Sequence, residues 1–225
     1  MIHWPSLLVL VRHAEAENNV MSGEEKRHFP FSTHQCKLTS RGKKQAEILR
    51  NYLKKRFPKG FDAYYTSYYL RSWQTFKTVY PLIQPIEDSR LAELRRGVGE
   101  IISKKTLEKL NLREQMRKKI EGKFHHKPLN GESMAELETR LRDMATWMRI
   151  EHPKEEVIMF NHGKTILDFM KIFQNLPHEE VVNMHKTNPP ENASVTIFRG
   201  TVDKKTRKPK IVLEAYNIIP WKGKM

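Results

Sequence analysis

Two short apolar runs in this chain each end at a histidine. Residues 7–11 precede Arg12 and His13, and residues 157–160 precede an asparagine and then His162. Runs of this length, bounded by polar residues, are typical of buried strands. Ligands of open α/β sheets bind outside the carboxyl ends of the strands. We therefore expect the two histidines to face one pocket at the end of a sheet.

Segments with helical spacing lie between these runs and after them. Thr39 or Ser40 is placed to cap a helix that ends before Pro58. A second short strand at 62–67 leads into another helix, which Pro81 ends. This alternation of strand and helix is typical of sheets whose strands run parallel.

The second half of the chain continues the alternation. The elements expected there are a strand around Ile86, a long amphipathic helix that opens at Gly131-Glu132-Ser133, a helix over 165–173, and a terminal hairpin of 194–198 with 211–216. Glu132 is either a supporting partner of the site or the residue that caps the long helix, and we favour the cap. The order of elements predicts an α/β fold, a three-layer α/β/α sandwich around a mostly parallel sheet. At this length, residues 1–225 are expected to form one domain.

The composition predicts a soluble protein without a membrane span. Of the 225 residues, 38% are hydrophobic and 30% are charged, and no apolar run approaches the roughly 20 residues that cross a bilayer. The N-terminus lacks the basic start, long apolar stretch and small-residue cleavage site of a secretory leader. A lone cysteine, Cys36, forms no internal disulfide and suits a reducing compartment. We expect a cytoplasmic protein that does not insert into membranes.

The basic balance of the chain favours anionic ligands. The formal net charge is +15, and basic residues gather at 54–56, 103–127 and 204–208. Such a charge attracts phosphate esters, nucleic acid and anionic membranes alike. Aromatic residues are not interleaved with the basic segments and no nucleic-acid motif is present, so a nucleic-acid partner is not expected. The simplest interpretation of each basic segment is a solvated face.

Several short motifs between residue 7 and about residue 170 fit one catalytic pattern. They are Arg12-His13-Ala14-Glu15, Leu38 to Ala46, Thr66 to Thr75, Leu91-Ala92-Glu93, Gly131-Glu132-Ser133 and Asn161-His162-Gly163. In this order the chain resembles the histidine phosphatase superfamily, which includes the cofactor-dependent phosphoglycerate mutases and many acid and sugar phosphatases. The resemblance implies a phosphoglycerate mutase-like fold and phosphoryl transfer through a covalent phosphohistidine.

The resemblance also implies a role for each motif residue. His13 matches the histidine that becomes phosphorylated, and Arg12 and Arg71 match the arginines that grip the phosphoryl oxygens. His162 matches the second pocket histidine, which stabilises charge during transfer. Glu93 matches the general acid that protonates the leaving oxygen and then activates water.

Further positions match the family pattern less closely. Asn19, six residues after His13, fits the place of a phosphate-contacting asparagine, and its alternative is a plain loop residue. Glu15 is expected to orient or support the site, and Glu100 to lie in a lid. Lys164 stands where the family often has a second glycine after the pocket histidine, which adds a cation close to His162.

The segment after Glu93 separates phosphatases from mutases. Mutases of the family continue there into Gly-x-Leu-x-Gly-Leu-Asn-Lys, whereas residues 97–104 read Gly-Val-Gly-Glu-Ile-Ile-Ser-Lys. We therefore expect a phosphatase that acts on a small phosphorylated metabolite. The basic insert at about 100–130 lies where the family builds its lid. Two interpretations of the insert are open: it selects substrates with more than one anionic group, or it is only a solvated helix face.

Two alternatives remain open from the sequence. One is a phosphoglycerate-type mutase, and the other is a catalytically silent basic protein that binds acidic partners or nucleic acid. No cofactor is implied. A metal is not expected either, because the adjacent pair His125-His126 has side chains that diverge on a helix and no carboxylate cluster beside it.

Overall fold

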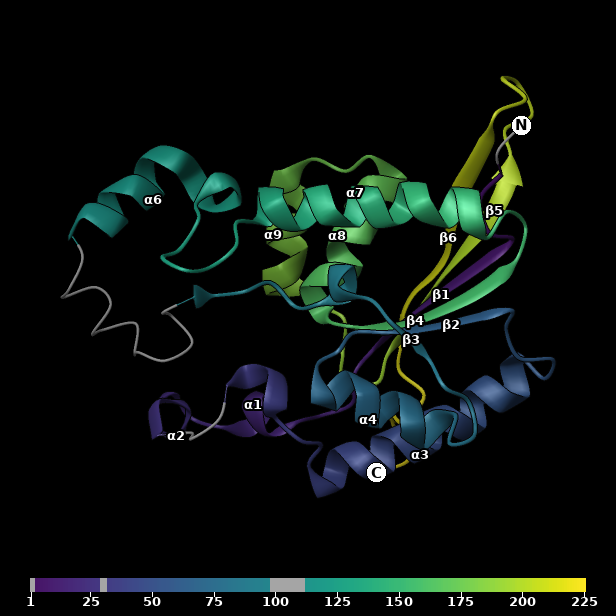
Figure 1. The fold of residues 1–225 in the computed structure, drawn as a ribbon, viewed down its shortest axis with the longest axis horizontal. Coiled ribbons are helices and arrows are strands. Elements are labelled where there is room, and N and C mark those ends of the chain that lie inside the picture. The colour runs from purple at the N-terminus through teal and green to yellow at the C-terminus, as the bar shows by residue number, and fades with distance from the viewer. Residues whose placement is uncertain (1–2, 29–31, 98–111) are drawn as a thin grey trace.

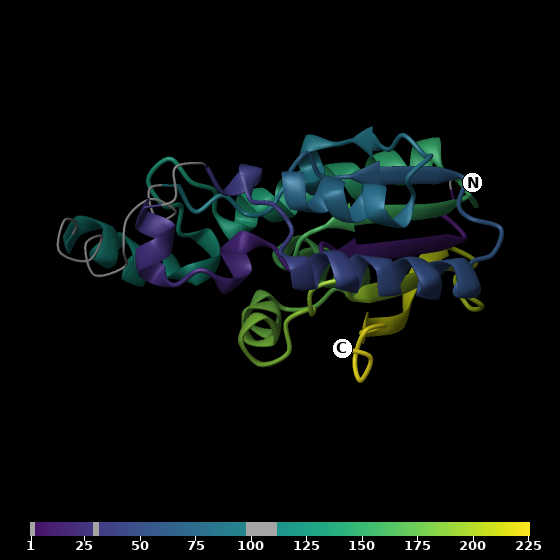
Figure 2. The same ribbon diagram turned by 90° about the horizontal axis from the view of Figure 1, so that it is seen from below.

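A mixed β-sheet between two layers of helices forms the body of the protein (Figures 1 and 2). This computed structural model describes residues 3–28, 32–97 and 112–225, with backbone alone at 24, 27, 28 and 112–114. The strands are β1 (Leu7–Arg12), β2 (Ala63–Thr66), β3 (Ile86–Glu87), β4 (Glu156–Asn161), β5 (Val195–Val202) and β6 (Pro209–Ile218). Their order across the sheet is β3-β2-β4-β1-β5-β6.

The helices divide between the two faces of the sheet. They are α1 (Glu17–Val20), α2 (Gly23–His28), α3 (Ser40–Arg56), α4 (Leu70–Val79), α6 (Leu112–His125), α7 (Met134–Glu151), α8 (Gly163–Gln174) and α9 (His178–Thr187), with 3-10 turns at Thr33–Gln35 and Ser89–Leu91. Figure 2 shows α3 and α4 in front of one face of the sheet. Helices α7 and α8 pack on the other face, so the predicted three-layer α/β/α sandwich is confirmed.

Strand β1 lies at the centre of the sheet because its apolar residues are buried on both sides. Leu8 and Leu10 belong to the core under α7 and α8. Leu7, Val9 and Val11 belong to the core under α3 and α4. A strand covered on both faces has no solvated side, which explains why the run is continuously apolar rather than alternating.

The sheet is parallel from β3 to β1 and antiparallel beyond. β1 pairs in parallel with β4, and β4 with β2, while β5 runs antiparallel to β1. β5 and β6 form the terminal hairpin that the sequence predicts, and β6 is an edge strand. No described helix is both long enough and apolar enough to cross a membrane.

Two predictions about helix caps are resolved by hydrogen bonds. Thr39, rather than Ser40, caps α3, because its Oγ1 accepts a hydrogen bond from the backbone N of Gly42 at 2.9 Å. Glu132 does not cap α7, and that prediction was wrong. Ser133 is the N-cap, and its Oγ accepts from the backbone N of Glu136 at 3.1 Å.

The carboxylate of Glu132 is bonded instead to an arginine farther along α7. It accepts hydrogen bonds from Arg140 Nε at 2.7 Å and from Arg140 Nη2 at 3.0 Å.

The helix that the sequence predicts within 103–127 corresponds to α6 over the residues that the structure describes. Residues 103–111 and Glu100 lie outside the described residues.

Replacing each of the two candidate cap residues of α3 by alanine tests this assignment. Thr39→Ala removes the bond to Gly42 and a second bond from Thr39 Oγ1 to Glu15 Oε1 at 2.7 Å. We expect it to lower the free energy of unfolding by about 1–2 kcal/mol. Ser40→Ala, at an exposed position, is the matched control and should change it by less than about 0.5 kcal/mol. Urea denaturation measures both, and equal losses would contradict the assignment.

Candidate active site

The parallel pairing of β1 with β4 brings the two predicted histidines together. Arg12 pairs with Asn161 at the last position of the register, and the backbone N of His13 donates to the carbonyl of Asn161 at 3.0 Å. The imidazole rings of His13 and His162 then lie 5.1 Å apart between centroids, and both side chains are buried. The two histidines at the carboxyl ends of β1 and β4 therefore lie side by side in one buried cluster.

Arg71, from the first turn of α4, joins the two imidazoles. Its Nε donates a hydrogen bond to His13 Nε2 at 3.0 Å, and its Nη2 donates to His162 Nδ1 at 3.2 Å. Its Nη1 donates to the carbonyl of Thr33 at 2.7 Å. A guanidinium only donates, so each imidazole nitrogen that faces Arg71 accepts and carries no proton.

The opposite ring nitrogens fix both tautomers. His13 Nδ1 donates to the carbonyl of Ala14 at 2.8 Å, and His162 Nε2 donates to Ser67 Oγ at 2.9 Å. Tyr69, the N-cap residue of α4, lies edge-on to His162 at 4.9 Å between centroids. The expected start of this helix near Ser67 shifts to Leu70, because Ser67 is used as a hydrogen-bond partner of the pocket.

Burial and positive neighbours keep both histidines neutral. The pKa of His13 is well below its ordinary value, first because the ring is buried and then because Arg71 and Arg12 repel a proton on it. The pKa of His162 is lowered in the same way by burial, by Arg71 and by His13. The lone pair on His13 Nε2 is therefore available at neutral pH.

Arg12 supplies a second guanidinium, on a half-buried side chain. Its Nη1 donates to the carbonyl of Pro190 at 2.5 Å, while its buried Nε has no hydrogen-bond partner among the described residues. Gly163, the first residue of α8, lies beside this side chain, and a Cβ there would be in ordinary van der Waals contact with Arg12 Nε at 3.5 Å. An unpaired buried donor is costly, and an oxyanion in the pocket would satisfy it.

Glu93 is the carboxylate whose charge acts most strongly on the two arginines. Its negative charge raises the pKa of Arg12 and of Arg71 against the lowering caused by their burial. Glu93 follows the turn Ser89–Leu91, is half-buried, and its Oε1 accepts from the backbone N of Leu94 at 2.9 Å. Glu93 is thus the carboxylate that acts on both guanidiniums, whereas Glu191 acts on Arg12.

The other carboxylate of the first motif is used for support. Glu15 accepts hydrogen bonds from Thr39 Oγ1 at 2.7 Å and from Arg41 Nη1 at 2.9 Å, which ties the loop after β1 to α3. This contact agrees with the orienting or structural interpretation of Glu15. Because these two bonds engage the carboxylate of Glu15, Glu93 is the better candidate for the general acid.

Asn19 holds the loop after His13 rather than lying free in it. Its Oδ1 accepts from the backbone N of Ala16 at 3.0 Å and from Asn192 Nδ2 at 3.3 Å. Asn192 Nδ2 also donates to the carbonyl of His13 at 3.1 Å. Because the oxygen of Asn19 accepts both bonds, its amide nitrogen is the atom left to donate to an anion.

Sequence reasoning does not find several polar residues near the site, of which Asn192 is half-buried and Thr75 and Asp168 are buried. Asn192 reaches His13 because β5 runs antiparallel beside β1, and Thr75 Oγ1 accepts from the backbone N of Ala14 at 2.9 Å. Asp168 on α8 is fully buried with neither oxygen bonded among the described residues, and burial followed by Glu138 raises its pKa to about 7. Only tertiary contacts reveal these roles, and no local motif marks them.

The described residues contain no group of three or more His, Cys, Asp or Glu side chains that could hold a metal ion. His126 pairs with Glu121 at 3.1 Å, whereas the ring of His125 lies edge-on to Phe124. The two imidazoles of this adjacent pair therefore serve different neighbours.

Comparison with known proteins was made on sequence and on structure. The family model of the histidine phosphatase superfamily, branch 1, matches residues 8–209. Among curated proteins, none matches this chain.

Solved structures share the fold at low sequence identity. The alpha-ribazole phosphatase from Shigella flexneri is 20% identical with a TM-score of 0.71, over 94% of this chain and 96% of that one. A mycobacterial glucosyl-3-phosphoglycerate phosphatase is 19% identical with a TM-score of 0.69, over 95% and 99%. A protein described as mycobacterial hydrolase 1 has a TM-score of 0.72 at 19% identity, over 95% and 99%. With most of its length matched by the family model, the chain belongs to the histidine phosphatase superfamily, branch 1.

Proposed function

We propose that the protein is a metal-independent phosphomonoesterase that acts through a phosphohistidine at His13 on a small phosphorylated metabolite in the cytoplasm. The observation that carries this proposal is the unprotonated Nε2 of His13, held 3.0 Å from Arg71 Nε in a buried pocket with a second guanidinium. A neutral nitrogen nucleophile beside two cations suits attack on an anionic phosphoryl group.

The pocket residues divide the binding of the phosphoryl group. Arg12 Nε and the donors of Arg71 would hold the three phosphoryl oxygens, with the amide nitrogen of Asn19 as a further donor. Substrate binding would replace the bonds from Arg71 to the imidazoles. His162, also neutral, would then turn a ring N–H toward a phosphoryl oxygen and stabilise charge during transfer.

Transfer proceeds in two balanced steps. The lone pair of His13 Nε2 forms a bond to phosphorus, the bond from phosphorus to the leaving oxygen breaks, and the carboxyl proton of Glu93 goes to that oxygen. Glu93, now a carboxylate, takes a proton from water as the water oxygen attacks phosphorus. The bond from phosphorus to nitrogen then breaks, which returns the lone pair to His13 and releases inorganic phosphate.

Hydrolysis rather than mutase chemistry is favoured by the chain after Glu93. The mutase pattern expected there is absent from residues 97–104. Two structural relatives carry phosphatase names, which agrees with this choice. We further propose that the whole chain acts as one domain, with the basic insert at about 100–130 as its lid.

Loss of the nucleophile should abolish hydrolysis. In excess chelator, we expect the wild type to release phosphate from an aryl phosphate, and His13→Ala to lower kcat/KM by roughly a thousand-fold or more. His125→Ala, an exposed imidazole on α6, is the matched control and should retain activity. Activity that survives in His13→Ala, or that disappears with the chelator, would contradict the proposal.

Two imidazoles should fail to titrate in the usual range. The lowered pKa values of His13 and His162 mean that the folded protein resists protonation of these rings as pH falls through about 6.5. In NMR spectra recorded from pH 8 to pH 5.5, we expect their ring C–H signals to stay at neutral positions while exposed histidines shift. His13→Gln and His162→Gln assign the signals, and a normal titration of either ring would overturn the electrostatic argument.

A further inference from the structure

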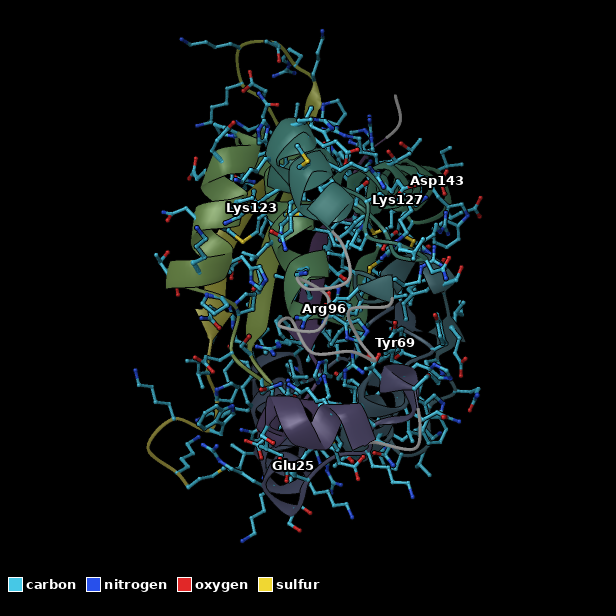
Figure 3. All side chains as sticks on the ribbon, turned by 90° about the vertical axis from the view of Figure 1, so that its left-hand side faces the viewer. Glu25, Tyr69, Arg96, Lys123, Lys127 and Asp143 are labelled. Atoms are coloured by element: carbon cyan, nitrogen blue, oxygen red, sulfur yellow. The ribbon has the colours of Figure 1, made fainter. Side chains whose placement is uncertain are left out.

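Residues 92–96, the loop that carries Glu93, form neither a helix nor a strand. Figure 3 shows Arg96 of this loop on the same face of the molecule as Tyr69, whose ring lies edge-on to His162. A general acid is effective only where its proton reaches the leaving oxygen, and a displacement of about 1 Å can lower a rate about a hundred-fold. Tertiary hydrogen bonds must therefore hold this loop in place of regular secondary structure.

Arg140 on α7 holds the backbone that leads into Glu93. Its Nη2 donates to the carbonyl of Ala92 at 2.8 Å, and its Nη1 donates to the carbonyl of Arg90. Its Nε and Nη2 also donate to Glu132, at 2.7 Å and 3.0 Å. These bonds use the planar fork of donors of an arginine, which a lysine ammonium cannot reproduce. One side chain thus fixes two carbonyls just before the acid.

Glu132 holds the backbone that follows Glu93. Its backbone N donates to the carbonyl of Arg95 at 2.8 Å, and its carboxylate accepts from the backbone N of Arg95 at 3.4 Å. The two chain segments approach so closely that a Cβ on Gly97, where φ is +58°, would lie 2.0 Å from the carbonyl oxygen of Leu129. The buried carboxylate is also paired with the arginine described above, so this ion pair joins the two sides of the loop.

Thr165 connects the loop to the helix that begins at the pocket histidine. Its side chain is fully buried, and its Oγ1 donates to the carbonyl of Ala92 at 3.3 Å. Thr165 lies in the first turn of α8, three residues after the N-cap residue His162. The carbonyl before the acid therefore has two donors, and one of them is set by the same helix start as the pocket histidine.

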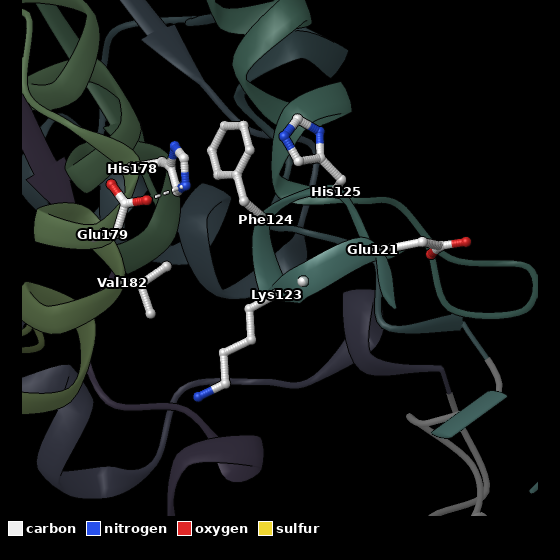
Figure 4. Close-up of a pocket in the computed structure, with 8 residues that line it drawn as sticks. Glu121, Lys123, Phe124, His125, His178, Glu179 and Val182 are labelled. Carbon is white, nitrogen blue, oxygen red and sulfur yellow. Dashed lines mark ion pairs between the residues drawn. The ribbon is translucent and has the colours of Figure 1, made fainter. Parts of the chain in front are cut away.

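The segment that leads from α6 to Glu132 is anchored at both ends. Figure 4 shows Phe124 near the end of α6 beside His178 of α9, and their rings stack with centroids 4.9 Å apart. Both rings line a pocket between the two helices. At the other end, Ser133 caps α7 directly after Glu132. These contacts fix the side chain that bonds to the loop of the acid.

We propose that Arg140, Glu132 and Thr165 are positioning residues, which hold the loop on both sides of Glu93 so that its carboxyl group faces the leaving oxygen. This inference rests on the proposed function, in which Glu93 is the general acid, and adds the residues that place it. The three act through the backbone of the loop rather than on the phosphoryl group. Because Glu93 Oε1 accepts from the backbone N of Leu94 at 2.9 Å, an ordered backbone also orients the carboxylate.

Two kinds of leaving group separate this role from a general loss of structure. The leaving group of 4-nitrophenyl phosphate departs without a proton, whereas the leaving oxygen of an alkyl phosphate needs the proton of Glu93. The alkyl substrate is whichever of glycerol 3-phosphate, glucose 6-phosphate and fructose 6-phosphate the wild type hydrolyses fastest. The ratio kcat/KM covers the steps up to release of the leaving group, so the later attack of water does not enter it.

Variants of the positioning residues should lose activity on the alkyl phosphate alone. Arg140→Lys keeps the charge beside Glu132 but loses the fork, so we expect kcat/KM to fall about ten-fold or more for the alkyl phosphate and less than about two-fold for the aryl phosphate. Glu132→Gln and Thr165→Val should act in the same direction. Arg142→Lys is the matched control, because this arginine of α7 binds Glu138 at 2.8 Å, and it should leave both values unchanged.

A double variant tests whether Arg140 acts through Glu93. In the Glu93→Gln background, we expect Arg140→Lys to lower kcat/KM for the alkyl phosphate by less than about two-fold, because the acid that it would place is absent. Thermal unfolding confirms that each variant is folded at the assay temperature, and if Arg140→Lys is not, Thr165→Val takes its place. Equal losses on the two substrates, no loss on either, or a loss that adds in full to that of Glu93→Gln would overturn the positioning role alone.

Failure of the proposed function gives a different result. If the wild type hydrolyses none of the alkyl phosphates, or if Glu93→Gln lowers kcat/KM equally for the aryl and the alkyl phosphate, then Glu93 is not the general acid. Either result overturns the proposed function, and the positioning role with it.

Discussion

The hydrogen bonds from the buried guanidinium of Arg71 to two unprotonated imidazole nitrogens organise this site. A buried cation is costly unless it is paired, and here its hydrogen-bond partners are two neutral rings and the carbonyl of Thr33 rather than carboxylates. The same cation, with Arg12, holds the pKa values of His13 and His162 down. A phosphoryl group would pair with the charge of Arg71 and would accept a hydrogen bond from Arg12 Nε, which has no partner among the described residues.

The sheet makes this arrangement possible because β1 and β4 are adjacent and parallel. Both strands are buried on each face, which explains their continuous apolar runs. Because the two strands run in the same direction, these runs end at the same edge of the sheet and leave His13 and His162 side by side. Polar contacts then fix the loop that follows β1. Glu15 binds Thr39 and Arg41, and Asn192 holds the carbonyl of His13. Supporting residues of this kind limit the freedom of the nucleophile before substrate arrives.

The sequence predicts the parts of the fold that depend on local pattern. Continuous apolar runs mark β1 and β4. The family motifs mark the two histidines and Arg71, which the structure brings into contact, and Arg12 and Glu93, which lie close enough for their charges to interact. Local pattern leaves open whether Thr39 or Ser40 caps α3, and it assigns Glu132 wrongly, because the attraction of Arg140 eight residues away outweighs the cap. The role of Asn192 depends on a contact between distant segments, which no short motif records.

The central claim is that a covalent bond forms between phosphorus and His13 Nε2. The most direct test is to mix the enzyme with a phosphorylated substrate, quench in alkali, in which phosphohistidine survives, and map the modified peptide by mass spectrometry. With an aryl phosphate, whose leaving group departs without the carboxyl proton of Glu93, we expect phosphorus on His13 in the wild type, more of it in Glu93→Gln, where the hydrolytic step lacks its base, and none in His13→Ala. Turnover of the substrate with no phosphorylated His13 in either the wild type or Glu93→Gln would contradict the mechanism.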